Sequence, residues 1–308
     1  MPQPTLLAVP NVSDGSDAQT IGAIADVALA SVQSTAPSAR LLDTHSDPDH
    51  DRSVFTLAAG PKGLTDALLA LARETVARID LTRADRRGQH PHVGALDVAP
   101  VVYLTPESRG AACAEALVLA DRLATELAIP VFLYGDLTAD ADRPARTRAD
   151  LRRGGLPALT ARMAGTLDAP PLRPDFGPQA PHPTAGVTLV SAREPLVAFN
   201  LQLALPATIE DAHRIASSIR EGGSQGLPGL RAIAIHLSGD VPQVSMNVER
   251  PLETPLAEIV SLVRSHAPLA SAELVGLAPA AAFEGFPEDL PMPGFDPARH
   301  LIENALQN

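Results

Sequence analysis

The sequence predicts an α+β fold built from two ferredoxin-like halves, each with the order strand–helix–strand–strand–helix–strand. Long segments with apolar residues at helical spacing alternate with short strand-like runs, and this order occurs twice along the chain. Between the halves, residues 169–183 contain six prolines, which suit neither a helix nor a sheet interior. We therefore expect subdomains at 1–168 and 184–308, joined by a connector at 169–183 and facing each other across a groove suited to a small ligand.

The first half is predicted to have the order βαββαβαβ. A polar turn at 11–17 ends in candidate helix caps and precedes an apolar stripe that begins at Ile21. Residues 45–52 are expected to form a loop, and the arginine-rich segment 136–163 is predicted to be helical in two pieces. The expected strands are 5–9, 40–44, 53–58, 99–104 and 131–134, and the expected helices are 21–32, 64–79 and 109–127.

The second half repeats the pattern after the prolines. Thr208 is a candidate helix cap, with Asp211 in the first turn of the helix that follows. A glycine-rich turn occupies 222–229. The expected strands are 187–191, 196–203, 230–237, 243–248 and 273–277; helices are expected from 208 and from 254, and a short helix near the end of the chain.

Composition excludes several classes of protein. The chain has 308 residues, 45% of them hydrophobic, and a net charge of −12 with acidic and basic residues mixed, which argues against a nucleic-acid partner. The single cysteine, Cys113, excludes a disulfide framework and a cysteine-based zinc site. No apolar run reaches the ~20 residues that a membrane span needs, so we expect a cytoplasmic protein that binds neither membrane nor nucleic acid.

The loop at 80–97 concentrates residues suited to catalysis. His90 precedes Pro91, which favours an extended backbone, and it lies between an expected helix and an expected strand. A histidine held there suits proton transfer, because its ordinary pKa is near neutral. Two alternatives stay open: the loop histidines serve only as hydrogen-bonding groups, or His90, His92 and Asp97 bind a metal ion.

Two further segments allow more than one interpretation. The sequence Pro-Asp-Phe-Gly-Pro at 174–178 is either a plain turn or a place where Phe176 stacks on a flat heterocycle. The glycine-rich sequence at 222–226 lacks the spacing of a phosphate-binding loop. His45 and His50 flank several aspartates, which indicates a solvated acidic turn.

Together, several of these stretches resemble the formiminotransferase family, known from the N-terminal part of formiminotransferase-cyclodeaminase. They span nearly the whole chain in the family's order. The matching segments are 9–15 (VPNVSDG), 50–56 (HDRSVFT), 88–97 (GQHPHVGALD), 129–135 (IPVFLYG), 174–178 (PDFGP), 198–200 (AFN) and 243–247 (QVSMN).

The resemblance implies a function and a set of site residues. It implies transfer of a formimidoyl group between N-formimidoyl-L-glutamate and N5 of tetrahydrofolate, in histidine breakdown, by a stand-alone transferase that forms a homodimer. It places the catalytic histidine at His90 and folate in the groove between two ferredoxin-like subdomains, with tetrahydrofolate as co-substrate and no metal. The folate-contacting residues that it implies are Phe176, Gly177, Pro178, Gln179, Pro183, Thr184, Gly186 and Asn200.

Two arginines are candidates for binding the substrate's carboxylates. Arg52 and Arg193 present the planar guanidinium that pairs with a carboxylate through two hydrogen bonds, although both could equally be structural surface residues. Gln89, His92 and Asp97 are candidate supporting residues around His90.

The sequence departs from the family pattern near the expected site. Gln89 stands where glutamate is usual, which should lower the pKa of His90. The other three departures are His92 for arginine, Asp51 for asparagine and Gln202 for asparagine. They motivate an alternative, a diverged paralogue that binds folate without this transfer or acts on 5-formyltetrahydrofolate. A metal-dependent hydrolase that uses His90, His92 and Asp97 is a third hypothesis.

Overall fold

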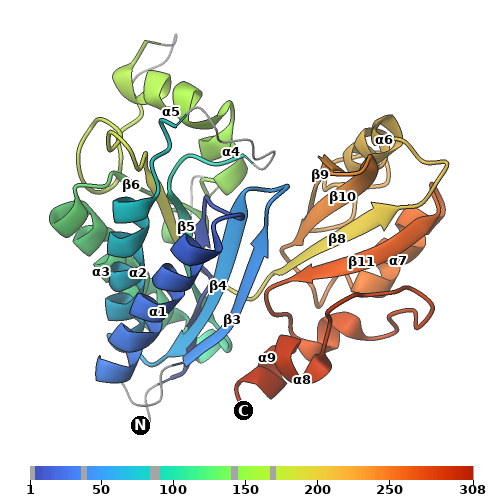
Figure 1. Ribbon diagram of the computed structural model, residues 1–308, viewed down its shortest axis with the longest axis horizontal. Coiled ribbons are helices and arrows are strands. Elements are labelled where there is room, and N and C mark those ends of the chain that lie inside the picture. The colour runs from blue at the N-terminus through green and yellow to red at the C-terminus, as the bar shows by residue number, and fades with distance from the viewer. Residues whose placement is uncertain (1–3, 36–39, 84–90, 140–144, 167–170, 308) are drawn as a thin grey trace. The chain divides into compact units, whose positions relative to one another are not determined.

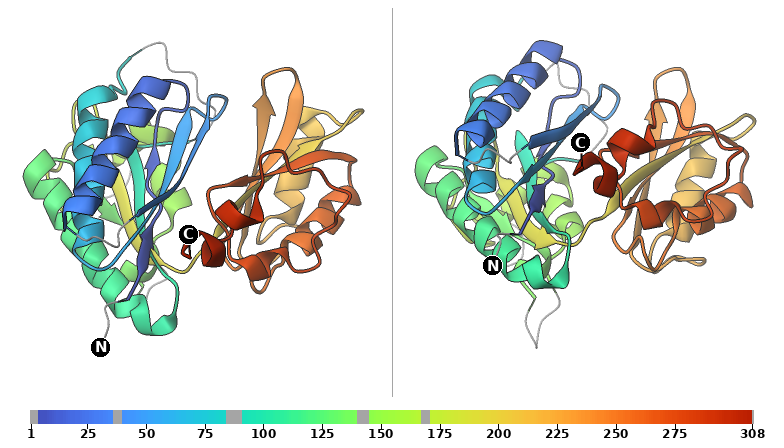
Figure 2. Two further views of the ribbon diagram at one scale, coloured as in Figure 1. Left: turned by 60° about the horizontal axis from the view of Figure 1, so that its bottom comes forward. Right: turned by 90° about the horizontal axis from the view of Figure 1, so that it is seen from below.

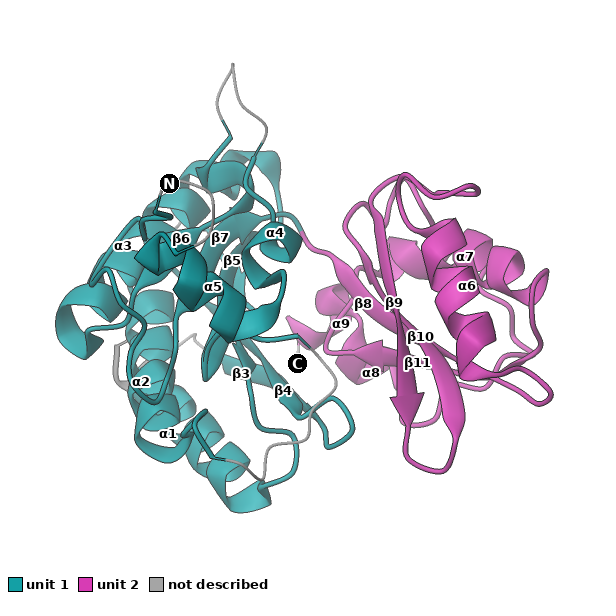
Figure 3. Ribbon diagram, turned by 90° about the horizontal axis from the view of Figure 1, so that it is seen from above, with its two compact units in different colours: residues 1–194 teal, residues 195–308 magenta. Residues whose placement is uncertain are grey.

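The computed structural model of the chain contains two sheets and divides into two compact units, 1–194 and 195–308 (Figures 1 and 3). The protein is therefore a mixed α/β protein. The structure describes residues 4–35, 40–83, 91–139, 145–166 and 171–307.

The first sheet contains seven strands, most of them antiparallel. β1 and β2 both pair antiparallel with β4 and with β5, and β3 pairs with β4 at one edge. On the other side, β7 pairs parallel with β5 and with β6. The strands are β1 (Leu6–Ala8), β2 (Asn11–Val12), β3 (Arg40–Asp47), β4 (Arg52–Ala59), β5 (Leu96–Tyr103), β6 (Val131–Leu133) and β7 (Thr188–Arg193).

Helices cover both faces of the first sheet. On one face, α1 (Ala18–Thr35), α2 (Gly63–Arg78) and α3 (Arg109–Leu127) bury the larger core, and Figures 1 and 2 show α1 and α2 side by side there. On the other face, α4 (Arg148–Arg152) and α5 (Gly155–Ala164) form a smaller core. The alternation of side chains along each strand separates the two cores.

Two predictions about the first unit are corrected. The segment at 188–193, expected in the C-terminal subdomain, is β7 of the first sheet, because its backbone pairs with β5 and β6. The first unit consequently continues through the proline-rich segment to Glu194. Residues 45–47, expected in a loop, belong to β3, because their partners in β4 extend the ladder to Asp47.

The second sheet is antiparallel, in the order β11-β8-β10-β9, and α6 and α7 cover one of its faces. Thr208 caps α6 as predicted, in a reciprocal pair with Asp211. Alternate residues of each strand, such as Phe199 and Leu201, enter the core. The elements are β8 (Val197–Leu203), α6 (Ile209–Ile219), β9 (Leu230–Leu237), β10 (Val241–Val248), α7 (Leu256–Arg264), β11 (Leu269–Val275), α8 (Pro297–His300) and α9 (Ile302–Ala305).

Within the portion of the chain that the structure describes, no helix combines the length and the apolar character needed to cross a bilayer.

Candidate functional site

Three segments from distant parts of the chain meet at the end of the first sheet where β4, β5 and β7 begin. The Ser13 N–H donates to the Ala95 carbonyl at 2.8 Å, and the Ser13 hydroxyl donates to the Gly94 carbonyl at 2.8 Å. The Ala95 N–H donates to the Ala185 carbonyl at 2.9 Å. These hydrogen bonds join the segment at 9–15 to two segments that contain expected site residues, the 80–97 loop and the segment at 183–186.

Two glycines allow these backbones to approach so closely. A Cβ at Gly94 would lie 1.9 Å from the Val187 carbonyl oxygen, and a Cβ at Gly15 would lie 1.9 Å from the Asp47 carbonyl oxygen. No side chain fits at either position without a backbone shift. The close approach explains both glycines without assigning them a ligand.

A buried ion pair lies at the start of β5. Asp97 is 2% exposed and accepts the Val93 N–H on Oδ1 at 2.8 Å, while its Oδ2 is paired with Nη2 of Arg152 from α4. Burial lowers the pKa of Arg152, and the charge of Asp97 acts in the opposite direction. The pair fixes the segment from His92 to Asp97 against α4.

Positive charge accumulates beside this pair. Burial, followed by the charges of Arg152 and Arg148, lowers the pKa of Arg52 to about 10, while Asp97 and Asp47 oppose that shift. Even so, Arg52 stays protonated at neutral pH. The guanidinium groups of Arg148 and Arg152 lie close enough to Arg52 to lower its pKa. A cluster of three guanidinium groups creates a positive potential that attracts an anionic ligand such as a carboxylate.

The turn from β3 to β4 holds Arg52 in place. Asp47 accepts the Asp49 and His50 N–H groups on Oδ1 at 2.8 and 3.0 Å, and its Oδ2 lies 2.5 Å from His50 Nδ1. Asp51 has a φ of 48° and its Oδ1 accepts the Gly15 N–H at 3.3 Å. Because aspartate adopts this left-handed conformation almost as readily as asparagine, the departure at position 51 is compatible with the turn.

The Asp47→Asn variant should lose stability in a pH-dependent way. Burial acts to raise the pKa of Asp47, but hydrogen bonds from His50 outweigh it and lower the pKa from 3.8 to about 2. The carboxylate therefore stabilises the fold above pH 4 and loses this contribution as the pH falls from 4 to 2. We expect urea unfolding to show the variant roughly 2 kcal/mol less stable than wild type at pH 6. The difference should shrink towards pH 2, and a constant difference would contradict this origin of the effect.

The structure brings several of the predicted site residues together. His92, Asp97 and Arg52 lie at this end of the first sheet, and so does Gly186, which pairs with Gly94 and has a φ of 70°. Thr184 also lies here, because its carbonyl accepts the Leu81 N–H at the start of the 80–97 loop at 2.8 Å. Gln89 and His90 lie outside the described residues.

Arg193 is in a different place from Arg52. It ends β7 beside Val102, whereas Arg52 begins β4, so the two arginines stand at opposite ends of the sheet. Five residue steps along a strand span about 16 Å, and the Arg193 Nη1 donates to the Glu194 carbonyl at 2.9 Å. The two arginines are therefore separate candidates for carboxylate binding, and each stays a prediction.

The loop at 176–179 packs against the body of the first unit. The Phe176 ring packs against the larger core, and its backbone pairs with Val131 at the β6 edge of the sheet. The Gln179 amide donates to the carbonyls of Met163 and Leu172 at 3.0 and 3.1 Å. Phe176 is only half-buried by this packing, so stacking on a heterocycle stays a prediction. Pro178 and Pro183 are exposed on the same segment.

Among the described residues, no group of three histidine, cysteine, aspartate or glutamate side chains is arranged to hold a metal ion. Because Asp97 is already paired with Arg152, it is poorly suited to bind a metal together with His92. His90, the third residue of the metal-dependent hydrolase hypothesis, lies outside the described residues, so that hypothesis stays untested.

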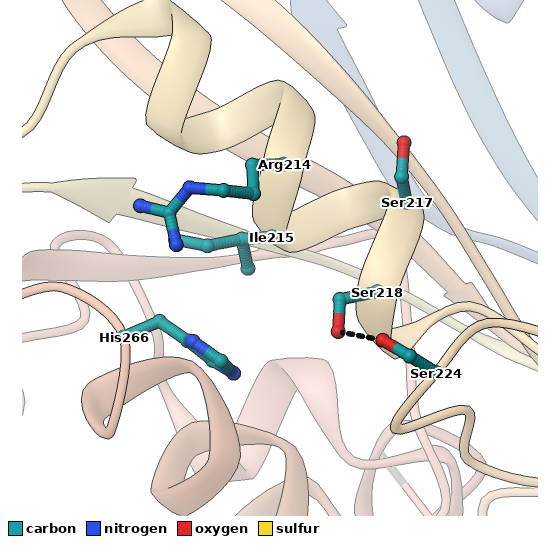
Figure 4. A pocket seen from close by; sticks show the side chains of 6 residues that line it. All are labelled: Arg214, Ile215, Ser217, Ser218, Ser224 and His266. Carbon is teal, nitrogen blue, oxygen red and sulfur yellow. Dashed lines mark hydrogen bonds between the residues drawn. The ribbon is translucent and has the colours of Figure 1, made fainter.

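The glycine-rich turn at 222–226 belongs to the helix side of the second unit. Its Gly223 and Gln225 N–H groups donate to the Arg220 and Ser218 carbonyls at 2.7 and 3.0 Å, so the turn closes the end of α6. A shallow cavity of about 320 Å³ lies alongside (Figure 4). Its polar lining is largely engaged within the chain: Arg214 pairs with Asp211, Ser218 with Ser224, and His266 with Gln225.

Sequence reasoning missed four residues of this candidate site. They are Arg148 and Arg152, and the pair of Asp47 with His50. The arginine-rich composition of 136–163 was visible, but no spacing indicates that Arg152 meets Asp97, 55 positions away. The aspartates around His50 indicated a solvated turn, whereas His50 is 2% exposed.

These features define an α+β protein of two sheet-containing units, with a cationic site where distant loops meet. Residues 5–193 match the model of the formiminotransferase domain, N-terminal subdomain. The chain belongs to the formiminotransferase family.

Named relatives match over most of the chain. A glutamate formimidoyltransferase from Streptococcus pyogenes is 35% identical, and the match covers 97% of each chain. A glutamate formimidoyltransferase from Thermoplasma acidophilum is 34% identical, covering 89% of this chain and 88% of its own. The formimidoyltransferase-cyclodeaminase of Gallus gallus is 35% identical over 89% of this chain, which spans 50% of that longer protein.

Proposed function

We propose that the protein is a glutamate formimidoyltransferase that moves a formimidoyl group between N-formimidoyl-L-glutamate and N5 of tetrahydrofolate, in histidine degradation and one-carbon metabolism. The similarity to two glutamate formimidoyltransferases over nearly their whole lengths carries this proposal. The cationic site agrees with it, because both substrates contain carboxylates. A homodimer, a cytoplasmic location and a folate groove between the units stay predictions of the family resemblance.

The transfer requires proton movement at one carbon. Attack of an amine on the amidine-like carbon forms a tetrahedral adduct, which needs a base for the incoming amine and an acid for the departing nitrogen. One imidazole near neutral pH does both, and His90 is the residue to which the resemblance assigns this role. Asp97 and Arg152 support it, because they hold the segment that begins two residues after His90.

The carboxylates of glutamate require cationic partners, and the cationic site of the first unit provides guanidinium groups. Arg52 is our candidate, and the neighbouring Arg148 and Arg152 strengthen the positive potential around it. For folate, Thr184 and Gly186 lie at the same end of the sheet. The remaining folate contacts, at 176–179, Pro183 and Asn200, are proposals from the resemblance.

We also propose that both units contain the ferredoxin-like arrangement. The second unit has the strand–helix–strand–strand–helix–strand order and the sheet order β11-β8-β10-β9. In the first unit the same arrangement would comprise β1 to β5 with α1 and α2, extended by β7 and β6 beyond β5.

A transfer assay on the purified protein tests the proposed function. N-formimidoyl-L-glutamate and tetrahydrofolate are supplied, and the formimidoyl-folate and the released glutamate are quantified. We expect catalytic turnover with stoichiometric formation of both products. A parallel reaction with 5-formyltetrahydrofolate and glutamate tests the diverged alternative. Turnover in the second reaction alone would overturn the proposed substrate, and folate binding without turnover in either would overturn the enzyme.

A further inference from the structure

One face of the second sheet presents several polar side chains from β8, β10 and β11. Along β8 and β10, alternate residues such as Phe199 and Val244 enter the core under α6 and α7, so the residues between them point to the opposite face. We call this the amide face. Its members are Asn200, Gln202, Gln243, Ser245, Ser271 and Glu273.

Four side chains on the amide face form hydrogen bonds in two pairs. The Asn200 Nδ2 donates to Glu273 Oε2 at 2.8 Å, and the Ser271 hydroxyl donates to Gln202 Oε1 at 2.9 Å. Gln202 is directly opposite Gln243 in the β8–β10 ladder. These hydrogen bonds therefore hold the neighbours of Gln243 in fixed positions within the chain itself.

Gln243 is the exception on this face. Its side chain is 0% exposed, and within the described chain neither its amide oxygen nor its amide nitrogen has a hydrogen-bond partner. Buried polar groups in native proteins are nearly always hydrogen-bonded, because an unpaired one loses its hydration without compensation. On its other side the ladder places Ile235 of β9, which provides no polar group. A partner from outside the chain would resolve this imbalance.

The chemistry of the amide defines the partner. A primary amide offers one acceptor and one donor side by side in a plane, so it matches a ligand edge with an adjacent donor and acceptor. It carries no charge and provides nothing specific for a carboxylate or a phosphate. The amino-oxo-pyrimidine ring of a pterin has such an edge, with a ring N–H beside a carbonyl oxygen.

We propose that Gln243 determines specificity for the pterin ring of folate, with its Nε2 donating to the ring carbonyl and its Oε1 accepting from the ring N–H. This inference rests on the proposed function, since that function supplies the folate.

Calorimetric titration with 5-formyltetrahydrofolate tests the proposal. It compares wild-type protein with the Gln243→Met variant. Methionine keeps the length of the side chain but lacks both hydrogen-bonding atoms of the amide. We expect the variant to bind about 10- to 100-fold more weakly, as the loss of two hydrogen bonds implies. Its thermal stability without ligand should be unchanged or higher, because the unpaired amide is gone. Gln225→Met, the same substitution on the helix side of the unit, should bind as wild type does.

A second ligand makes the test specific to the ring edge. A 4-amino analogue of folate, which lacks the ring carbonyl, should bind wild type more weakly than its 4-oxo counterpart, and Gln243→Met should discriminate much less between the two. Wild-type affinity in Gln243→Met, or unchanged discrimination, would overturn the proposal and indicate that ordered water satisfies the amide. If wild-type protein binds no folate at all, the proposed function fails and the inference fails with it.

Discussion

The His90→Ala variant is expected to reduce kcat for formimidoyl transfer by about 10²- to 10⁴-fold, the usual loss when a general acid–base group is removed. The reason is chemical: without the imidazole, the incoming amine keeps its proton and the departing nitrogen leaves as a poor, unprotonated group. Binding of both substrates should change little, because neutral alanine removes no charge that a carboxylate needs. Steady-state rates with both substrates saturating measure the effect.

The control for this variant is His213→Ala, which removes an exposed histidine from α6. It should turn over as wild type does. The pH–rate profile adds a second readout, because the limb that reports deprotonation of the base should disappear with His90 and persist with His213 removed. A His90→Ala protein with the wild-type rate would exclude His90 as the proton-transfer group.

The Asp97→Asn variant is expected to lower the free energy of unfolding by about 3–5 kcal/mol, the cost of leaving a buried charge without its partner. Arg152 is 9% exposed and is paired with Asp97, so after the substitution its guanidinium faces a neutral amide in a buried environment. The asparagine oxygen can still accept the Val93 N–H. Stability loss should therefore come from the charge and not from that hydrogen bond. Urea unfolding measures it.

A double-mutant cycle isolates the pair. Asp97→Asn with Arg152→Met removes both charges, so the double variant should be more stable than the sum of the single losses predicts. Arg153→Met is the matched control. It removes the next arginine along the chain, whose side chain is 80% exposed and pairs with Asp150, and it should leave stability nearly unchanged. Additive losses at Asp97 and Arg152 would show that the two charges do not stabilise each other.

Local patterns in the sequence predicted most of the secondary structure. The helix at 109–127 and the strand at 230–237 have the predicted bounds, because each is a continuous run of one periodicity. The cap at Thr208 was equally predictable, since capping depends on residues only three positions apart. The strand at 188–193 was also recognised as a strand. We nevertheless assigned this strand to the second half, because the pattern of residues in a strand does not indicate which other strands it pairs with.

Part of the site was also accessible from the sequence. His92, Asp97 and Arg52 were selected from their segments, and the structure brings those segments to one end of a sheet. Arg193 was selected on the same chemical ground as Arg52, yet it stands at the far end of β7. A guanidinium is recognisable in a sequence, but its distance from another guanidinium depends on strand direction.

The sequence by itself determined the two-part α+β organisation, the family and the catalytic candidate, because periodicity, caps and motifs are properties of neighbouring residues. Only the tertiary structure decided that the first sheet extends to Glu194, that Arg152 neutralises Asp97 and that Gln243 lies buried opposite Gln202. Each of these depends on contacts between residues far apart in the chain, and such contacts follow from strand pairing and burial, which no local pattern encodes.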